Sequence, residues 1–285
     1  MAFPPDVFLI GAQKAGTTTL ADMLDRHPGI TVADPKEPHF FTRNWARGLD
    51  WYRGCFPGRE ATLFVDASTS NAGAPLADSE RARRSPLAGV PRRIYQVSPG
   101  ARFLYIVRDP VERTYSAYWH EVRTGDERRG FREAIEGDGA FLRVSDYAGQ
   151  LRQFLAYFPL ARFKILRFED LRRDPEAVAR ECFAFLGLEA PAEGVAPPGA
   201  RNPSYTYNRL GRAVARVLPR DRVLKPASRL ARNLLPAGWY ARAGRLLTRR
   251  IPPMAEADRR ALEDHFRPRN RAFRELTGIH TGYPE

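Results

Sequence analysis

The chain has 285 residues, of which 43% are hydrophobic and 28% are charged, so it can bury a sizeable core and is too apolar to be intrinsically disordered. The formal net charge is +13, and only four of the 46 basic residues are lysines: Lys14, Lys36, Lys164 and Lys225. The two cysteines exclude a disulfide framework and a four-cysteine zinc site. No apolar run is long enough to span a membrane, and the first residues lack the basic and apolar pattern of a signal peptide. We therefore expect a cytoplasmic protein.

Short apolar runs alternate with amphipathic helical patterns over the first 190 or so residues. Strands are predicted, in chain order, at Val7–Ile10, Ile30–Val32, Thr62–Val65, Arg102–Val107 and Arg162–Leu166. Helices are predicted at Thr17–His27, Val111–Arg123, Asp146–Phe158 and Pro175–Leu186, among others. This alternation predicts an α/β fold in which a mostly parallel central sheet of about five strands is flanked by helices in a three-layer sandwich.

The first predicted strand runs into a loop bracketed by Gly11 and Gly16, and a helix follows at once. Such a loop is an anion cradle, because backbone N–H groups and the positive end of the helix dipole face the ligand. Lys14 adds a compact full charge. In nucleoside-triphosphatase loops the lysine follows the second glycine, whereas here Thr17 holds that position and the lysine comes two residues earlier. The loop predicts a P-loop-like phosphate site, with a purely structural glycine turn as the alternative, and argues against a nucleotide kinase.

A second anion site is predicted where the fourth strand ends. Arg108 leaves the carboxyl end of that strand, which is where open α/β sheets place ligands. Asp109 is placed to cap the next helix, and Glu112 completes the spacing of a capping box. Ser116 falls almost two turns into that helix, so the Arg108 fork and the Ser116 hydroxyl can together hold a phosphate. A surface ion pair is the alternative for Arg108.

These two segments resemble those of the sulfotransferase superfamily, whose donor, 3′-phosphoadenosine 5′-phosphosulfate, has two anionic ends. The loop around Lys14 looks like the 5′-phosphosulfate loop, and the segment from Arg108 to Ser116 looks like the 3′-phosphate site. Four further segments are similar to the heparan-sulfate and bacterial carbohydrate branch: Lys36–Phe41, Arg167–Leu171, Phe183–Leu188 and Arg267–Asn270. The resemblance implies a sulfotransferase with a P-loop-like fold.

The resemblance also implies roles for individual residues. The phosphosulfate would be held by the Lys14 side chain and by the backbone amides of Ala15, Gly16, Thr17 and Thr18, and the 3′-phosphate by Arg108 and Ser116. Glu37 would be the catalytic base, Lys14 would stabilise charge on the leaving phosphate oxygen, and no metal is needed. His39 is the alternative base, and a plain surface ion pair with Lys36 is the alternative reading of Glu37.

The acceptor is implied only as a class, namely the hydroxyl of a carbohydrate, a glycolipid or a natural product. The branch often carries a lysine after the acidic residue that follows the third strand, but here Asp66 is followed by Ala67. Thr42 also replaces an acidic residue that is common after the Phe-Phe pair. These departures bear on the sugar specificity of that branch more than on the chemistry.

Residues 201–250 contain thirteen basic residues and one acidic residue, a net charge of +12. Apolar residues at helical spacing and several prolines predict a basic helical lid, over residues 200–250, within a single domain that covers residues 1–285. A solvated arginine-rich face, contact with an anionic membrane surface and attraction of an acidic acceptor are alternatives. Nucleic-acid binding is the rival function, and a pI near 10.2 supports it. However, the sequence shows no nucleic-acid-binding signature, so we do not expect the protein to bind nucleic acid.

Overall fold

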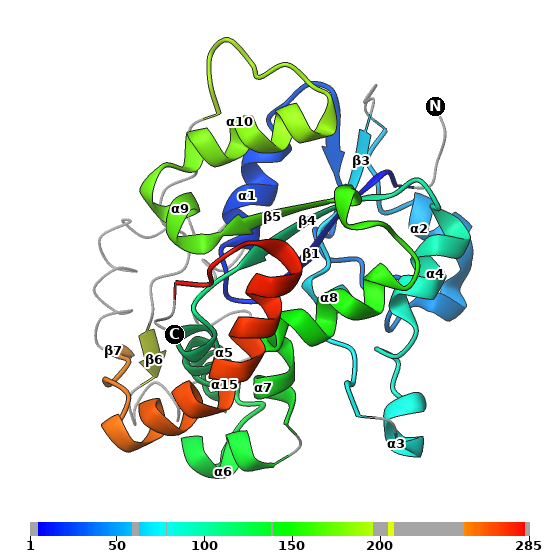
Figure 1. Ribbon diagram of the computed structural model, residues 1–285. Coiled ribbons are helices and arrows are strands. Elements are labelled where there is room, and N and C mark those ends of the chain that lie inside the picture. The colour runs from blue at the N-terminus through cyan, green and yellow to red at the C-terminus, as the bar shows by residue number, and fades with distance from the viewer. Residues whose placement is uncertain are drawn as a thin grey trace, which may run out of the picture.

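The computed structural model describes residues 5–58, 63–77, 79–137, 139–195, 205–207 and 248–282. A five-stranded parallel sheet with the order β2-β3-β1-β4-β5 lies at its centre (Figure 1). Its strands are β1 (Val7–Gly11), β2 (Ile30–Val32), β3 (Leu63–Asp66), β4 (Arg102–Val107) and β5 (Phe163–Arg167). All five predicted strands are therefore confirmed to within a residue.

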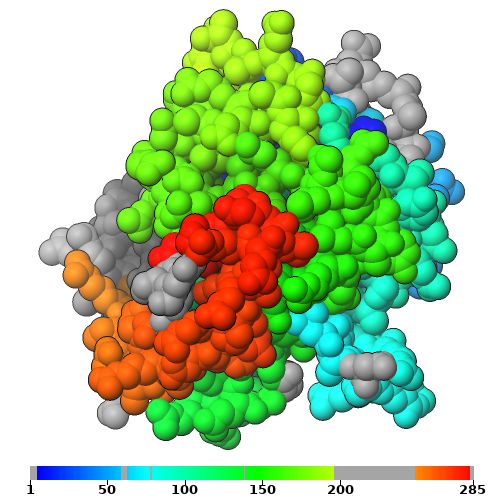
Figure 2. All heavy atoms as spheres, viewed as in Figure 1, coloured from blue at the N-terminus to red at the C-terminus, as the bar shows by residue number. Residues whose placement is uncertain are grey.

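Helices cover both faces of the sheet. The helices of the described residues are α1 (Thr17–Leu24), α2 (Gly48–Arg53), α3 (Glu80–Arg83), α4 (Val90–Val97), α5 (Pro110–Thr124), α6 (Phe131–Glu136), α7 (Ala140–Ser145), α8 (Tyr147–Leu155), α9 (Phe168–Arg173), α10 (Pro175–Leu186) and α15 (Glu256–Thr277). Figure 1 shows α1, α9 and α10 on one side of the sheet and α4 and α8 on the other. The long C-terminal helix α15 packs against α8 and α5, and Figure 2 shows it lying across the surface there. The predicted α/β sandwich is confirmed.

The apolar strand patterns produce the core. All five residues of β1 are buried, and five of the six residues of β4 are buried, as expected for central strands covered on both faces. On one face Phe103 stacks on Phe163 with ring centroids 4.6 Å apart. Because parallel strands end at the same edge of the sheet, the loops after β1, β3 and β4 are brought together there.

Two predicted helices, Thr17–His27 and Asp146–Phe158, are shorter in the structure, where they span Thr17–Leu24 and Tyr147–Leu155. The first helix ends at Leu24 rather than at His27. His27 Nδ1 accepts a hydrogen bond from the Gly29 amide at 2.9 Å, which draws the chain into a turn. Asp146 is the N-cap of α8 rather than its first residue, since its carboxylate accepts the Gly149 amide at 2.8 Å.

The predicted basic helical lid lies outside the described residues, apart from its two ends. There, β6 (Tyr205–Tyr207) and β7 (Thr248–Arg250) pair as an antiparallel ladder, so these short pieces are strands rather than helices. Within the part of the chain that the structure describes, no helix combines the length and the apolar character that crossing a membrane requires.

Candidate active site

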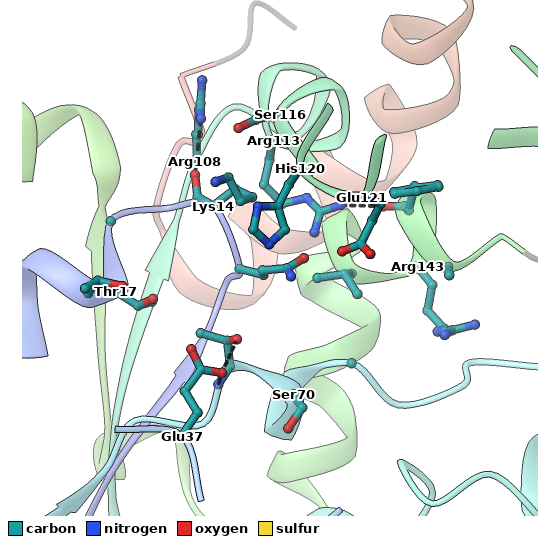
Figure 3. Close-up of a pocket in the computed structure, with 18 of the residues that line it drawn as sticks. Lys14, Thr17, Glu37, Ser70, Arg108, Arg113, Ser116, His120, Glu121 and Arg143 are labelled. Carbon is teal, nitrogen blue, oxygen red and sulfur yellow. Dashed lines mark hydrogen bonds between the residues drawn. The ribbon is translucent and has the colours of Figure 1, made fainter. Parts of the chain in front are cut away.

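The predicted site residues gather around one cavity of about 1140 Å³ at the carboxyl edge of the sheet (Figure 3). The predicted residues that line it are Lys14, Gly16, Thr17, Thr18, Glu37, His39, Arg108 and Ser116. They come from the loop after β1, the segment after β2 and the start of α5. The volume is slightly above the range of about 300–1,000 Å³ usual for a site that holds one drug-sized ligand.

The glycine loop is built to bring backbone close to a ligand. Gly16 caps α1 in the left-handed region with φ 86°. A Cβ at this position would lie 2.9 Å from Leu171 Cδ2 and 3.1 Å from Phe168 Cδ2, so any other residue would force these two side chains on α9 to shift. The segment Arg167–Leu171, one of those that resemble the sulfotransferase superfamily, therefore packs against this loop through Phe168 and Leu171.

Ala15 is the member of the predicted phosphosulfate loop that does not line the cavity. Its side chain is fully buried. Its amide donates to the Ala12 carbonyl at 3.1 Å within the loop. That the amides from Ala15 to Thr18 hold a ligand stays a prediction.

Positive charge is concentrated around Lys14. Burial, together with the neighbouring guanidinium groups of Arg123 and Arg108, lowers the pKa of Lys14 to about 8, while Glu121 acts in the opposite direction. Arg108 Nη1 donates to the Lys14 carbonyl oxygen at 3.1 Å, which ties the two predicted anion sites together. The Arg108 guanidinium lies 4.9 Å from the centre of the Phe168 ring. A cluster of cations at this depth favours an anionic ligand.

The start of α5 is capped as predicted, but only in part. The Asp109 carboxylate accepts the Val111 amide at 2.8 Å and the Glu112 amide at 3.1 Å. The predicted reciprocal bond from Glu112 is not made, because Arg259 on α15 binds the Glu112 carboxylate at 2.7 Å. The Asp109 amide instead donates to Glu169 Oε1 at 3.4 Å, a long bond.

The two candidate bases lie on the segment after β2. Glu37 Oε1 is 3.0 Å from Lys36 Nζ, so the ion pair considered as an alternative is present, but Glu37 also lines the cavity. Burial by itself raises the pKa of Glu37; the charge of Lys36 and hydrogen bonds from Lys36 and Thr69 outweigh it and hold the pKa below its usual value. Burial lowers the pKa of His39, and His39 Nδ1 forms a hydrogen bond of 2.8 Å with Ser70 Oγ.

Three further cavity residues on α5 were not predicted from the sequence. Arg113 is 1% exposed; one nitrogen donates to the Phe141 carbonyl at 2.8 Å, while Nε and Nη1 have no partner among the described residues. Burial and nearby cations, Lys14 first among them, lower the pKa of His120 to about 4. Burial raises the pKa of Glu121. The helical spacing of Arg113 and His120 relative to Ser116 places them on one face, a signal that could have found them.

Comparisons with known proteins agree with this geometry. The family model described as "Sulfotransferase domain" matches residues 4–198. Mouse heparan sulfate glucosamine 3-O-sulfotransferase 6 is 31% identical over 193 residues, which are 65% of this chain and 53% of that protein. The Drosophila melanogaster bifunctional heparan sulfate N-deacetylase/N-sulfotransferase is 32% identical over 206 residues, covering 65% of this chain and 20% of that one. The chain thus spans about half or less of the length of these curated relatives.

Among solved structures, a sulfotransferase from Alicyclobacillus acidocaldarius superimposes with a TM-score of 0.67 and 24% identity, and 97% of each chain is covered. That likeness shows that the described part of the chain shares the fold of that protein.

Proposed function

The chain belongs to the sulfotransferase family, and from this membership we propose that it transfers the sulfuryl group of 3′-phosphoadenosine 5′-phosphosulfate to an acceptor hydroxyl by in-line displacement. The observation that carries the proposal is the shared cavity, in which two cationic positions, Lys14 and Arg108, face a carboxylate, Glu37. The rival functions drawn from the sequence, nucleic-acid binding and nucleotide phosphorylation, have no comparable support.

The residues at the donor end fit a doubly anionic ligand. Gly16 caps α1 with its backbone in the left-handed region, and Lys14 adds a positive charge in the same loop. Lys14 and the amides of Ala15 to Thr18 would hold the phosphosulfate, and Arg108 with Ser116 would hold the 3′-phosphate. The buried Arg113, with two nitrogens lacking an acceptor in the described part of the chain, adds to the demand for negative charge.

The chemistry needs a base, a charge-stabilising group and fixed positions. Glu37 would accept the proton of the acceptor hydroxyl as that oxygen attacks sulfur, a contribution of typically about 10²–10⁴-fold. Its lowered pKa keeps it ionised at neutral pH, and the same shift makes it a weaker base. Lys14, with a pKa of about 8, remains mainly protonated at pH 7 and would stabilise charge developing on the leaving phosphate oxygen. His39 is the alternative base, because its lowered pKa keeps it neutral at pH 7.

We further propose a carbohydrate, glycolipid or hydroxylated natural product as the acceptor, since the relatives reported above are named for heparan sulfate. The proposed reaction uses no metal. A cytoplasmic location also belongs to the proposal, and contact of residues 201–250 with an anionic membrane surface is the alternative to a lid over a soluble acceptor.

The test is direct. The protein is incubated with sulfur-labelled donor and fractionated lysate, and the labelled product is identified, with Lys14→Ala as the control. Label that transfers equally with the Lys14→Ala variant would contradict the proposal.

A further inference from the structure

Three consecutive residues after β3, here called the support turn (Ser68–Ser70), each hold a different part of the candidate base segment. Ser68 Oγ accepts the His39 amide at 3.0 Å. Thr69 donates twice to Glu37 Oε2, from its amide at 3.2 Å and from its hydroxyl at 2.9 Å. Ser70 Oγ bonds to His39 Nδ1 at 2.8 Å. Figure 3 marks hydrogen bonds at the Glu37 carboxylate with dashed lines. The support turn therefore determines how both candidate bases are oriented.

The support turn is itself anchored by a buried carboxylate. Asp66, the last residue of β3, is 0% exposed. Its Oδ2 accepts the Tyr52 hydroxyl at 2.6 Å, and its Oδ1 accepts the Ser68 amide at 2.8 Å. A buried carboxylate is tolerated only when it is hydrogen-bonded, so breaking either bond has a high cost. The first residue of the turn is consequently fixed to the sheet.

The hydrogen bonds also select one oxygen of Glu37. An ionised carboxylate offers about four acceptor positions. Thr69 uses the two on Oε2, while Lys36 Nζ is an ion-pair partner 3.0 Å from Oε1. The open hydrogen-bond positions are on Oε1, so this oxygen is the one available to take a proton from an acceptor.

We propose that Thr69, held in place by Asp66, is a positioning residue that fixes the Glu37 carboxylate so that Oε1 alone receives the acceptor proton. The inference rests on the proposed function, because it takes Glu37 as the base. Thr69 contacts neither the acceptor oxygen nor the donor sulfur in this proposal, and it acts only through Glu37. Since its two bonds favour the ionised carboxylate, they also set the acidic limb of the rate profile.

Several charged groups face this site and bear on that limb. Lys36 is the ion-pair partner of Glu37, and His39 Nε2 lies 3.9 Å from Glu37 Oε2. From α5, His120 interacts with Glu37 and has a pKa of about 4, near the carboxylate range. Besides burial, the positive charge of Arg43 lowers the pKa of His39. The pH profiles are therefore recorded both in the wild-type background and with His120→Gln.

The experiment compares Thr69→Val with Thr69→Ser in the full chain. It uses a labelled donor and the acceptor that the labelling experiment described above identifies. Thr69→Val keeps the shape and the amide bond but removes the hydroxyl bond to Glu37. We expect kcat to fall by roughly 10–100-fold, because misplacing a catalytic group by about 1 Å can cost about 100-fold. The acidic limb of kcat shifts to higher pH in both backgrounds, while the affinity for 3′-phosphoadenosine 5′-phosphate is unchanged. Thr69→Ser restores kcat and the limb.

Thr277→Val is the matched control, since its hydroxyl donates to the Phe273 carbonyl at 2.7 Å on α15, away from the cavity. Unchanged kcat and pH profile in Thr69→Val, with Glu37→Gln inactive, would overturn the inference and leave the base assignment standing. A fully active Glu37→Gln would instead overturn the base and the inference with it. If Thr69→Val does not fold, Tyr52→Phe takes its place, because it removes a hydrogen bond to Asp66. We then expect a smaller fall in kcat and a smaller shift of its acidic limb. A wild-type pH profile of kcat in Tyr52→Phe would refute the role of Asp66 as an anchor.

Discussion

Gly16→Ala tests whether the glycine loop is shaped by backbone conformation alone or also by close packing. Gly16 has φ 86°, and an L-residue in this left-handed region costs about 1–2 kcal/mol. The new methyl group would also lie 2.9 Å from Leu171 Cδ2 and 3.1 Å from Phe168 Cδ2, an overpacking that typically costs about 1–3 kcal/mol. Leu171 Cδ2 is the end of a flexible side chain and can yield, so we take the lower half of that range. The expected loss of stability is about 2–4 kcal/mol.

Gly89→Ala is the matched control. Gly89 also caps a helix in the left-handed region, with φ 69°, but a Cβ there would meet nothing within 4 Å. It should therefore show the backbone cost without the packing cost. Thermal unfolding measures both, and about 2–4 °C per kcal/mol is expected for a chain of this size. Affinity for 3′-phosphoadenosine 5′-phosphate, from calorimetry, should fall at least about tenfold in Gly16→Ala, because a shifted loop misplaces its amides. It should stay at the wild-type value in Gly89→Ala. Equal unfolding temperatures and equal affinities for the two variants would refute the packing argument.

Four further predictions concern the donor, the base and the basic region. 3′-phosphoadenosine 5′-phosphate binds in the presence of a chelator much more tightly than adenosine 5′-phosphate does, and equal affinities in calorimetry would remove the second anion site. The affinity for 3′-phosphoadenosine 5′-phosphate falls as pH rises through about 8, because the pKa of Lys14 is lowered to about 8 and the ammonium that attracts the anion is lost above it. Lys14→Arg abolishes this pH dependence and also loses most turnover, because it lacks a compact ammonium. Glu37→Gln lowers kcat by about 10²-fold or more with donor affinity nearly unchanged, whereas loss of turnover in His39→Ala alone would reverse the assignment of the base. The chain floats with anionic but not neutral liposomes at low salt if residues 201–250 contact lipid, and absence from the anionic liposome fraction at low salt would exclude the membrane version.

The parts of this protein that its sequence determines are those encoded by neighbouring residues. The apolar runs predict five strands, and the structure has them to within a residue, because a central parallel strand must be apolar throughout. The Gly11–Gly16 loop and the Asp109 cap are also local, since spacing along a few residues decides which backbone groups can bond. Once these strands lie parallel, their loops meet at one edge of the sheet, so the joint placement of Lys14 and Arg108 follows from topology.

Tertiary structure alone decided the partners of the site residues. Glu112 has the spacing of a capping box, yet Arg259, 147 residues away, binds it, because a charge-assisted bond competes with the backbone amide. Thr69 was not singled out, although it holds Glu37 from 32 residues along the chain. Neither contact leaves a periodic or spaced pattern in the sequence, because hydrogen-bond partners across a fold are set by where loops meet in space. The contacts between side chains from distant segments are therefore the part of the site that only the folded chain defines.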